Sequence, residues 1–250
     1  MFEFLTLPER TAKPRESGLT HVLDKGYSLE QVRQFLEVSG EYVDIVKLGW
    51  GTAVVTPNVK EKIALYQSFG IPVCFGGTFF EVCLRQGKFD EFLALVDECG
   101  MECVEISDGT VAMDQGDKLA ILRKLSKRYK VLSEVGSKDE AVVITPSTWI
   151  DSIKRELEAG AWKVITEGRE SGTVGIYRPT GDVKDGLLEE IRESFDITQL
   201  LFEAPIKKQQ AWFITQFGTN VNLGNIPPDE VISVETLRVG VRGDTLLTFH

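Results

Sequence analysis

Short apolar runs alternate with longer amphipathic stretches along the whole chain. The short runs are rich in β-branched residues and bounded by turn residues, as buried strands typically are. They predict strands at 19–23, 42–48, 71–75, 102–107, 130–135, 162–166, 199–203 and 219–223. Apolar residues at helical spacing predict helices at 28–39, 58–69, 88–99, 116–129, 147–159, 184–194, 206–217 and 228–238.

This alternation indicates a parallel sheet whose faces are covered by helices. Eight strand–helix units within 250 residues predict an α/β fold of the (β/α)8 TIM barrel type. We expect one barrel domain over 1–250, with an N-terminal arm at 1–18 and a C-terminal tail at 239–250. Either end would pack across the barrel or reach a neighbouring subunit. A doubly wound open sheet is the alternative, and the lack of a GxGxxG turn after the first strand counts against it.

Net charge and composition restrict the partners and the compartment. The chain has 38 acidic and 28 basic residues and a formal charge of −10, which disfavours nucleic acid and anionic membranes. No apolar run approaches the roughly 18 residues of a membrane span, and the first residues do not resemble a signal peptide. The four cysteines form no CxxC pair and are expected to be reduced thiols. We therefore expect a cytoplasmic protein that binds small molecules.

Histidine is scarce, since only His21 and His250 are present. This argues against a histidine-rich zinc site and against a Ser-His-Asp triad. A metal ion in this chain would be bound mainly by oxygen, which suits Mg²⁺.

Acidic residues follow four consecutive predicted strands. Working residues of (β/α)8 barrels lie at the carboxyl ends of the strands, and there the sequence has Glu105, Glu134, Glu167 and Glu203. Such crowding of negative charge calls for a divalent cation or nearby basic residues. We expect two or three of the four to be Mg²⁺ ligands, with the others orienting lysines or arginines. The alternative is that these glutamates are ordinary loop residues exposed to solvent.

Basic and polar residues near the strand ends are the candidates for binding an anionic substrate. Lys47 has the strand parity of Ile45, which would place it on the barrel interior. A phosphate site often forms from the last loops of such barrels. The candidate substrate-binding residues are Lys25, Arg169, Asn222, Gly224, Asn225 and Arg242. Arg238 and Arg242 would bring positive charge to a cleft or an interface, or Arg238 would lie at a solvated helix end.

Several motifs together resemble the phosphosulfolactate synthase family. They are "VKLGWGT", "GGTFFE", "VEISDGT", "SEVGSK", "EGRESG", "FEAP", "VNLGNI" and "ETLRVGVRGDT", in order over residues 17–247. The resemblance implies a (β/α)8 barrel that adds sulfite to phosphoenolpyruvate with Mg²⁺, a carbon–sulfur lyase that forms (2R)-phosphosulfolactate. It also implies a homo-oligomer and a pathway to coenzyme M or to sulfolactate.

The same resemblance assigns the general acid to Lys138, and Lys47 is the second candidate catalytic residue. A Schiff-base aldolase with Lys47 or Lys138 as the nucleophile remains an alternative from the residues alone. A further alternative is a barrel without catalytic activity that only binds a ligand or serves as a scaffold, although four carboxylates at the strand ends argue against it.

Overall fold

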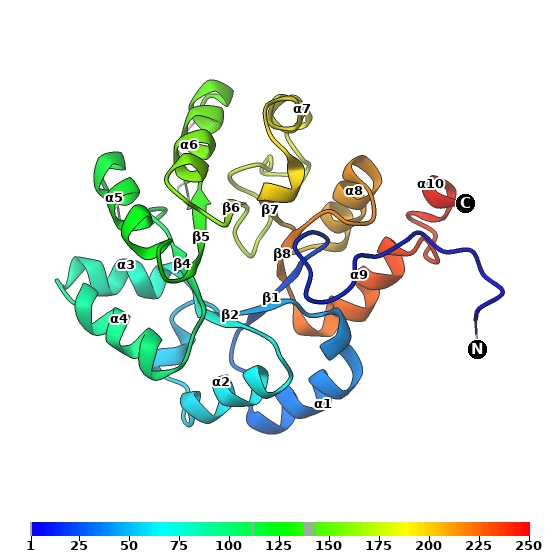
Figure 1. Cartoon of the computed structure of the whole chain (residues 1–250). Helices are drawn as coiled ribbons and strands as arrows, with labels where there is room; N and C mark the ends of the chain where they lie inside the picture. Colours follow the sequence, from blue (N-terminus) through cyan, green and yellow to red (C-terminus); the bar gives the residue numbers. More distant parts are fainter. Residues whose placement is uncertain (1, 112, 138–141, 143) are drawn as a thin grey trace.

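Eight parallel strands form one sheet that curls into a nearly closed barrel (Figure 1). The structure is a computed structural model, and it describes residues 2–111, 113–137, 142 and 144–250. The strands are β1 (Thr20–Asp24), β2 (Ile45–Leu48), β3 (Val73–Phe75), β4 (Cys103–Ile106), β5 (Lys130–Val135), β6 (Lys163–Thr166), β7 (Leu200–Glu203) and β8 (Leu223–Ile226). Their order is β3-β2-β1-β8-β7-β6-β5-β4, and the two edge strands, β3 and β4, pack beside each other. The predicted (β/α)8 fold is confirmed.

Helices surround the sheet on its outer side (Figure 1). They are α1 (Leu29–Ser39), α2 (Val59–Ser68), α3 (Gly77–Arg85), α4 (Phe89–Glu98), α5 (Gln115–Leu125), α6 (Pro146–Glu158), α7 (Asp185–Ser194), α8 (Lys207–Phe217), α9 (Val231–Arg238) and α10 (Leu246–Phe249). Helix α1 begins with a capping box, in which the Ser28 side chain accepts the Gln31 amide while the Gln31 side chain accepts the Ser28 amide.

Alternation along each strand separates two apolar cores. In β5, Val131 and Val135 belong to the large core between sheet and helices, whereas Leu132 belongs to a small core inside the barrel. The inner core consists of Leu19, Ile45, Cys74, Cys103, Leu132, Ile165 and Leu201. Side chains alternate along a strand, so the residue two positions after each of several inner-core residues also points to the barrel axis. These residues lie closer to the carboxyl ends of the strands.

Several elements differ from the sequence prediction, among them β8 and α3. The last strand starts at Leu223 rather than at 219, and the side chains of Asn220 and Asn222 just before it accept hydrogen bonds from Arg10 and from the Leu19 amide. Helix α3 was not predicted. It begins at Gly77, directly after β3, and its N-cap Gly76 has no side chain that would mark a helix start.

The N-terminal arm packs over the amino ends of the strands. Arg10 Nε lies 2.8 Å from Glu235 Oε1 on α9, and Arg15 Nη1 lies 3.1 Å from Asp44 Oδ1 just before β2. Glu16 accepts a hydrogen bond from Trp162 Nε1 at 2.9 Å, just before β6. The arm thus covers the end of the barrel that in this fold serves stability.

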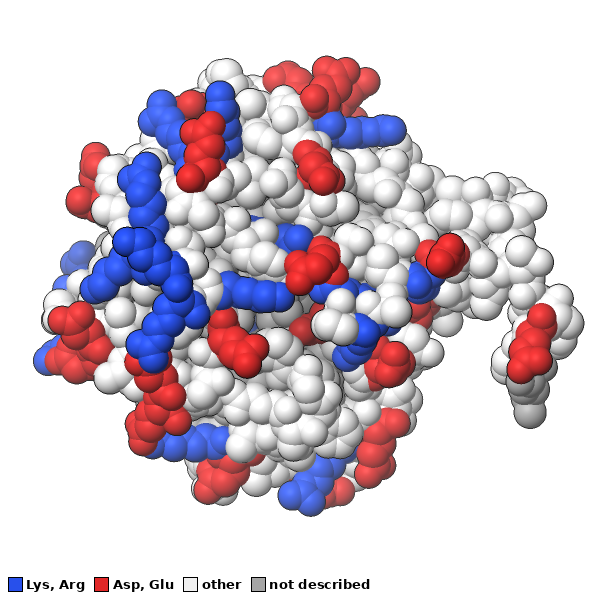
Figure 2. All heavy atoms as spheres, in the orientation of Figure 1, with Lys and Arg blue, Asp and Glu red and all other residues white. Residues whose placement is uncertain are grey.

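Surface charge is mixed. Acidic and basic side chains lie next to one another around the rim of the face in Figure 2. Among the described residues, no helix is both long and apolar enough to cross a membrane.

Candidate active site

A cavity of about 480 Å³ opens at the carboxyl ends of the strands. It is lined by Leu23, Lys47, Gly49, Trp50, Gly76, Gly77, Thr78, Glu105, Thr110, Glu134, Glu167, Arg169, Glu170, Glu203 and Asn225. These residues come from all eight strands or from the segments that directly follow them. The volume is that of a small-molecule site, at the end where barrels of this type carry their chemistry.

Several residues with strained backbone conformations line this cavity. In the described part of the chain, four non-glycine residues have a positive φ, and three of them, Trp50, Arg169 and Asn225, line the cavity with φ of 54°, 55° and 54°. Such conformations cost energy for a residue with a Cβ, and they tend to occur at functional sites. The strain supports the cavity as the candidate active site.

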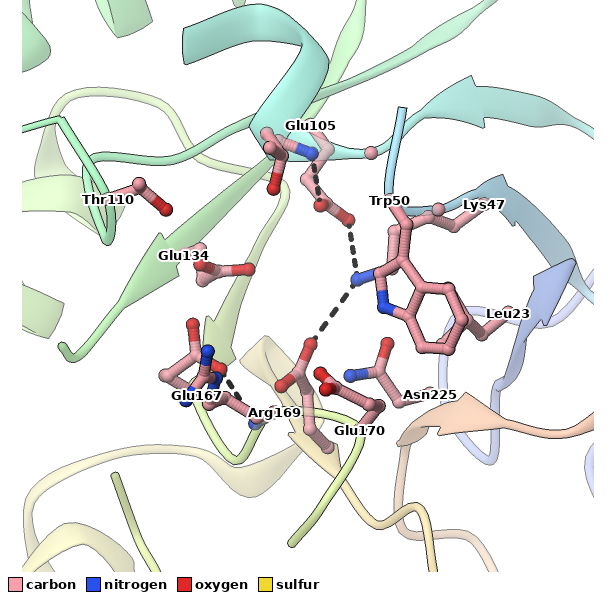
Figure 3. Close-up of a pocket in the computed structure, with 15 residues that line it drawn as sticks. Leu23, Lys47, Trp50, Glu105, Thr110, Glu134, Glu167, Arg169, Glu170 and Asn225 are labelled. Carbon is pink, nitrogen blue, oxygen red and sulfur yellow. Dashed lines mark hydrogen bonds and ion pairs between the residues drawn. The ribbon is translucent and has the colours of Figure 1, made fainter. Parts of the chain in front are cut away.

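Lys47 is a buried cation of the cavity. Its Nζ lies 3.3 Å from Glu105 Oε2 and 3.3 Å from Glu203 Oε1, and the residue is only 5% exposed (Figure 3). Burial alone would lower the pKa of Lys47, but Glu105 and Glu203 outweigh burial and raise that pKa. The ammonium is therefore charged at neutral pH and held in a fixed position.

All four predicted glutamates face the cavity and are buried. Glu105 Oε1 accepts the Gly77 amide at 2.7 Å, which also links the edge strands β3 and β4. Glu203 Oε2 accepts the Gly168 amide at 2.9 Å. Burial raises the pKa of Glu105, and Lys47 opposes that rise. These two carboxylates thus share the Lys47 ammonium and are tied to backbone amides.

Glu134 and Glu167 have different partners. Glu134 Oε1 lies 2.8 Å from Ser107 Oγ, and Glu167 Oε1 accepts the Arg169 amide at 2.7 Å. Both carboxylates lie on the β5–β6 side of the cavity (Figure 3). Four carboxylates around one cavity form an oxygen-rich set, which is the donor chemistry that Mg²⁺ prefers. The residues present therefore fit a magnesium ion.

A carboxylate from α3 braces the loop after β4. Glu81 Oε1 lies 2.8 Å from Ser107 Oγ, and Glu81 Oε2 accepts the amides of Thr110 and Val111 at 2.9 and 2.5 Å. Thr110 lines the cavity, so Glu81 positions part of its wall. Glu81 is the last residue of the motif "GGTFFE", and its contacts were not predictable because they depend on the unpredicted helix α3.

Three of the predicted substrate-binding residues lie at or beside the cavity. Arg169 and Asn225 line it. Lys25 is exposed, and its Nζ lies 4.9 Å from the centroid of the Trp50 ring, which forms part of the cavity mouth. Trp50 is 53% exposed and was not singled out from the sequence, because its left-handed backbone conformation has no sequence signal.

The structure does not bring the other predicted binding residues to the cavity. Asn222 lies before β8, where its Nδ2 donates to the Thr198 and Leu200 carbonyls at 3.0 and 2.7 Å. Gly224 lies within β8 and packs against Leu201. Arg242 lies in the C-terminal tail, with Nε 3.6 Å from Asp244 Oδ2. Lys138 lies outside the described residues.

Comparison with known proteins reveals a family that covers almost the whole chain. A profile of the (2R)-phospho-3-sulfolactate synthase (ComA) family matches residues 8–244. The phosphosulfolactate synthase of Methanocaldococcus jannaschii is 48% identical over 237 residues, covering 92% of this chain and 94% of the relative. That of Bacillus subtilis is 45% identical over 244 residues, covering 96% of this chain and 97% of the relative.

Solved structures with the same architecture are much more distant in sequence. The 3-hexulose-6-phosphate synthase of Salmonella typhimurium superposes with a TM-score of 0.57 at 13% identity, covering 87% of this chain and 97% of that one. At this identity the likeness shows the fold alone.

Proposed function

Because the chain belongs to the (2R)-phospho-3-sulfolactate synthase family, we propose that it adds sulfite to phosphoenolpyruvate with the help of Mg²⁺. The product would be (2R)-phosphosulfolactate. The observation that carries the proposal is the strand-end cavity, in which the charged Lys47 lies among four buried carboxylates. Such a site suits a small anionic substrate and a divalent cation.

The reaction forms one bond to sulfur and one to hydrogen. The sulfur lone pair of sulfite attacks C3 of phosphoenolpyruvate, the C2=C3 electron pair moves towards C2 and the carboxylate, and a proton is added at C2. When bound, Mg²⁺ would supply positive charge beside the substrate carboxylate. The family resemblance assigns the proton donor to Lys138, a general acid that would fix the configuration at C2.

Lys47 is the residue that we propose to stabilise the developing negative charge. Its ammonium is held by Glu105 and Glu203 before substrate arrives, so it needs no reorganisation during the reaction. Arg169 at the cavity wall and Lys25 at its mouth would screen the charges of two anionic reactants.

Glu134 and Glu167 are the carboxylates that we propose to hold Mg²⁺. Glu105 and Glu203 both lie 3.3 Å from Lys47 Nζ and hold that ammonium in place. Glu134 accepts a hydrogen bond from the Ser107 hydroxyl and Glu167 accepts one from the Arg169 amide, and both carboxylates line the cavity.

Replacing either proposed ligand should weaken Mg²⁺ binding. We expect Glu134→Gln or Glu167→Gln to raise the Mg²⁺ concentration for half-maximal activity by at least about tenfold, since an amide is a poorer ligand than a carboxylate. Glu170→Gln is the matched control, because Glu170 lies at the same cavity but is exposed. Titration of activity with MgCl₂ measures the shift. An unchanged Mg²⁺ requirement in both ligand variants would remove these glutamates from the metal site.

Substrate dependence tests the function itself. Purified protein should consume phosphoenolpyruvate when sulfite and Mg²⁺ are both present, and it should stop when either is omitted or when EDTA is added. Consumption without sulfite would indicate a different reaction.

A Schiff-base aldolase with Lys47 as its nucleophile is less consistent with the site. The nucleophile of such an enzyme must be a neutral amine, whereas Glu105 and Glu203 overcome the effect of burial and raise the pKa of Lys47. Borohydride trapping with a carbonyl substrate distinguishes the two chemistries, because only the aldolase would be trapped covalently.

A further inference from the structure

His21 is a buried histidine whose ring nitrogens form no hydrogen bond with the described residues. It lies in β1 with 0% exposure, and within the described residues neither Nδ1 nor Nε2 has a hydrogen-bond partner. Buried polar side chains nearly always have such a partner, and an exception calls for an explanation such as an ion. The mechanism proposed above makes no use of this imidazole.

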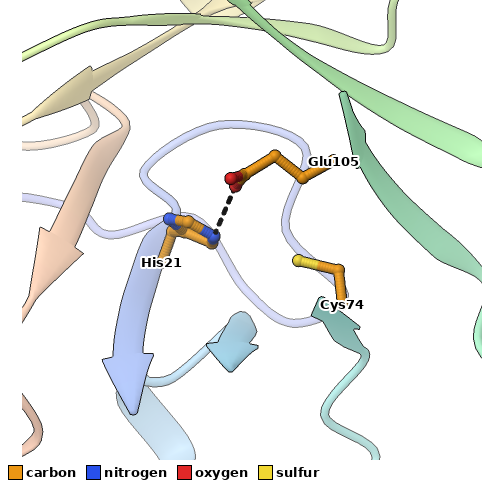
Figure 4. Close-up of side chains that lie close together, drawn as sticks. All are labelled: His21, Cys74 and Glu105. Carbon is orange, nitrogen blue, oxygen red and sulfur yellow. Dashed lines mark ion pairs between the residues drawn. The ribbon is translucent and has the colours of Figure 1, made fainter. Parts of the chain in front are cut away.

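Two other potential metal ligands on β3 and β4 lie close to the same ring. One ligand atom each of His21, Cys74 on β3 and Glu105 on β4 lie within 4.8 Å of one another (Figure 4). His21 Nε2 is 3.9 Å from Glu105 Oε2. All three side chains are buried, and they come from separate strands of a rigid barrel. The arrangement is thus held by the sheet rather than by a flexible loop.

The donor set differs in kind from the carboxylates described above. Imidazole nitrogen and thiolate sulfur favour Zn²⁺ and similar transition metals over Mg²⁺. Ligand bonds of about 2.0–2.3 Å to a tetrahedral ion place donor atoms about 3.3–3.8 Å apart, so the side chains would need only small movements to close around it. Glu105 also lines the large cavity, which leaves a position for water or for a substrate oxygen.

We propose that His21, Cys74 and Glu105 form a binding site for a thiophilic divalent metal ion such as Zn²⁺, separate from the Mg²⁺ ligands Glu134 and Glu167. Binding forms a metal–sulfur bond at Cys74, breaks its S–H bond and releases that proton to solvent. The surrounding charge favours a bound divalent cation, because the four buried glutamates that line the cavity outnumber Lys47 and Arg169, the cations that line it among the described residues.

The site would also act on Lys47. Lys47 Nζ lies 3.3 Å from Glu105 Oε2, the oxygen that faces His21, and 3.3 Å from Glu203 Oε1. A metal ion on Glu105 repels the ammonium and leaves Glu203 as its remaining carboxylate partner. Occupancy of the site would therefore change the position of the cation that the proposed reaction uses.

Cobalt titration tests the site without any activity measurement. Co²⁺ added to the metal-free chain should give a sulfur-to-cobalt charge-transfer band in the near ultraviolet that saturates at one ion per chain. Cys74→Ser should abolish the band, and His21→Val should weaken binding at least about tenfold. Cys99→Ser is the matched control, since Cys99 is a half-buried thiol outside the cluster, and it should keep the full band.

The outcomes separate this site from the proposed function. Absence of the band in the wild-type chain, its persistence in Cys74→Ser, or unchanged affinity in His21→Val would overturn the proposal. Displacement of Co²⁺ by millimolar Mg²⁺ would also contradict it, because the donor set should prefer cobalt. Far-ultraviolet circular dichroism confirms that each variant is folded, and none of these binding measurements depends on whether the chain catalyses sulfite addition.

Discussion

Lys47→Met should lower kcat/KM for sulfite addition by about 10³-fold or more, the scale on which enzymes lose a fixed charge or an acid–base group. The methionine has nearly the length of the lysine side chain but no charge. Two buried carboxylates, Glu105 and Glu203, would then face each other without the ammonium that lies 3.3 Å from each. Steady-state kinetics with phosphoenolpyruvate, sulfite and Mg²⁺ measure the loss.

A second variant separates catalysis from folding. Adding Glu105→Gln to Lys47→Met removes one of the two uncompensated carboxylates, so it should recover stability but no activity. Lys163→Met is the matched control, because Lys163 is also a buried barrel lysine, with its Nζ donating to the Glu16 and Thr198 carbonyls. Those partners lie at the amino end of the barrel, so this variant should keep its kcat. A Lys47→Met enzyme within tenfold of wild type would exclude Lys47 from the reaction.

Arg238→Met should lower the free energy of unfolding by about 3–5 kcal/mol, because it leaves buried carbonyls without their donor. Arg238 is 0% exposed at the end of α9. Its Nη1 donates to the Thr219 and Val221 carbonyls at 2.7 Å each, and Nη2 donates to the Leu19 carbonyl at 3.1 Å. These carbonyls precede β8 and β1, so one guanidinium joins the first and last strands of the barrel.

Arg242→Met provides the comparison for Arg238→Met. The Arg242 side chain is 34% exposed and lies 3.6 Å from Asp244, so its loss should change stability by less than about 0.5 kcal/mol. Urea denaturation followed by circular dichroism measures both variants. A loss below about 1 kcal/mol in Arg238→Met would show that water or neighbouring groups satisfy the carbonyls. Activity of the folded variant should be retained, because Arg238 lies at the end opposite the cavity.

The sequence predicts those parts of the site that depend on strand periodicity. Apolar residues at alternating positions define which side chains face the barrel axis, so Lys47 follows Ile45 to the interior. Glu105 and Glu203 end apolar strands in the same way, which is why the four carboxylates could be expected at one end of the barrel. The local sequence pattern was sufficient to predict these residues, because the carboxyl ends of all strands lie at the same end of a parallel barrel.

Features that depend on distant contacts were not predictable. Asn222 was expected in a phosphate site, but its side chain accepts the Leu19 amide and donates to carbonyls near β7. Arg238 was expected in a cleft, at an interface or at a solvated helix end, and it is fully buried. In both cases the partners are backbone groups far away in sequence, and backbone groups carry no sequence signal.

Analysis of the product is the most direct test of sulfite addition to phosphoenolpyruvate. Phosphoenolpyruvate labelled with ¹³C at C3 is incubated with sulfite, Mg²⁺ and the purified chain, and the mixture is examined by ¹³C and ³¹P NMR. We expect the spectra to show that the labelled carbon has become a methylene bonded to a sulfonate and that the phosphate ester is retained. Labelled pyruvate with free phosphate, or unchanged phosphoenolpyruvate in the presence of folded protein, would contradict it.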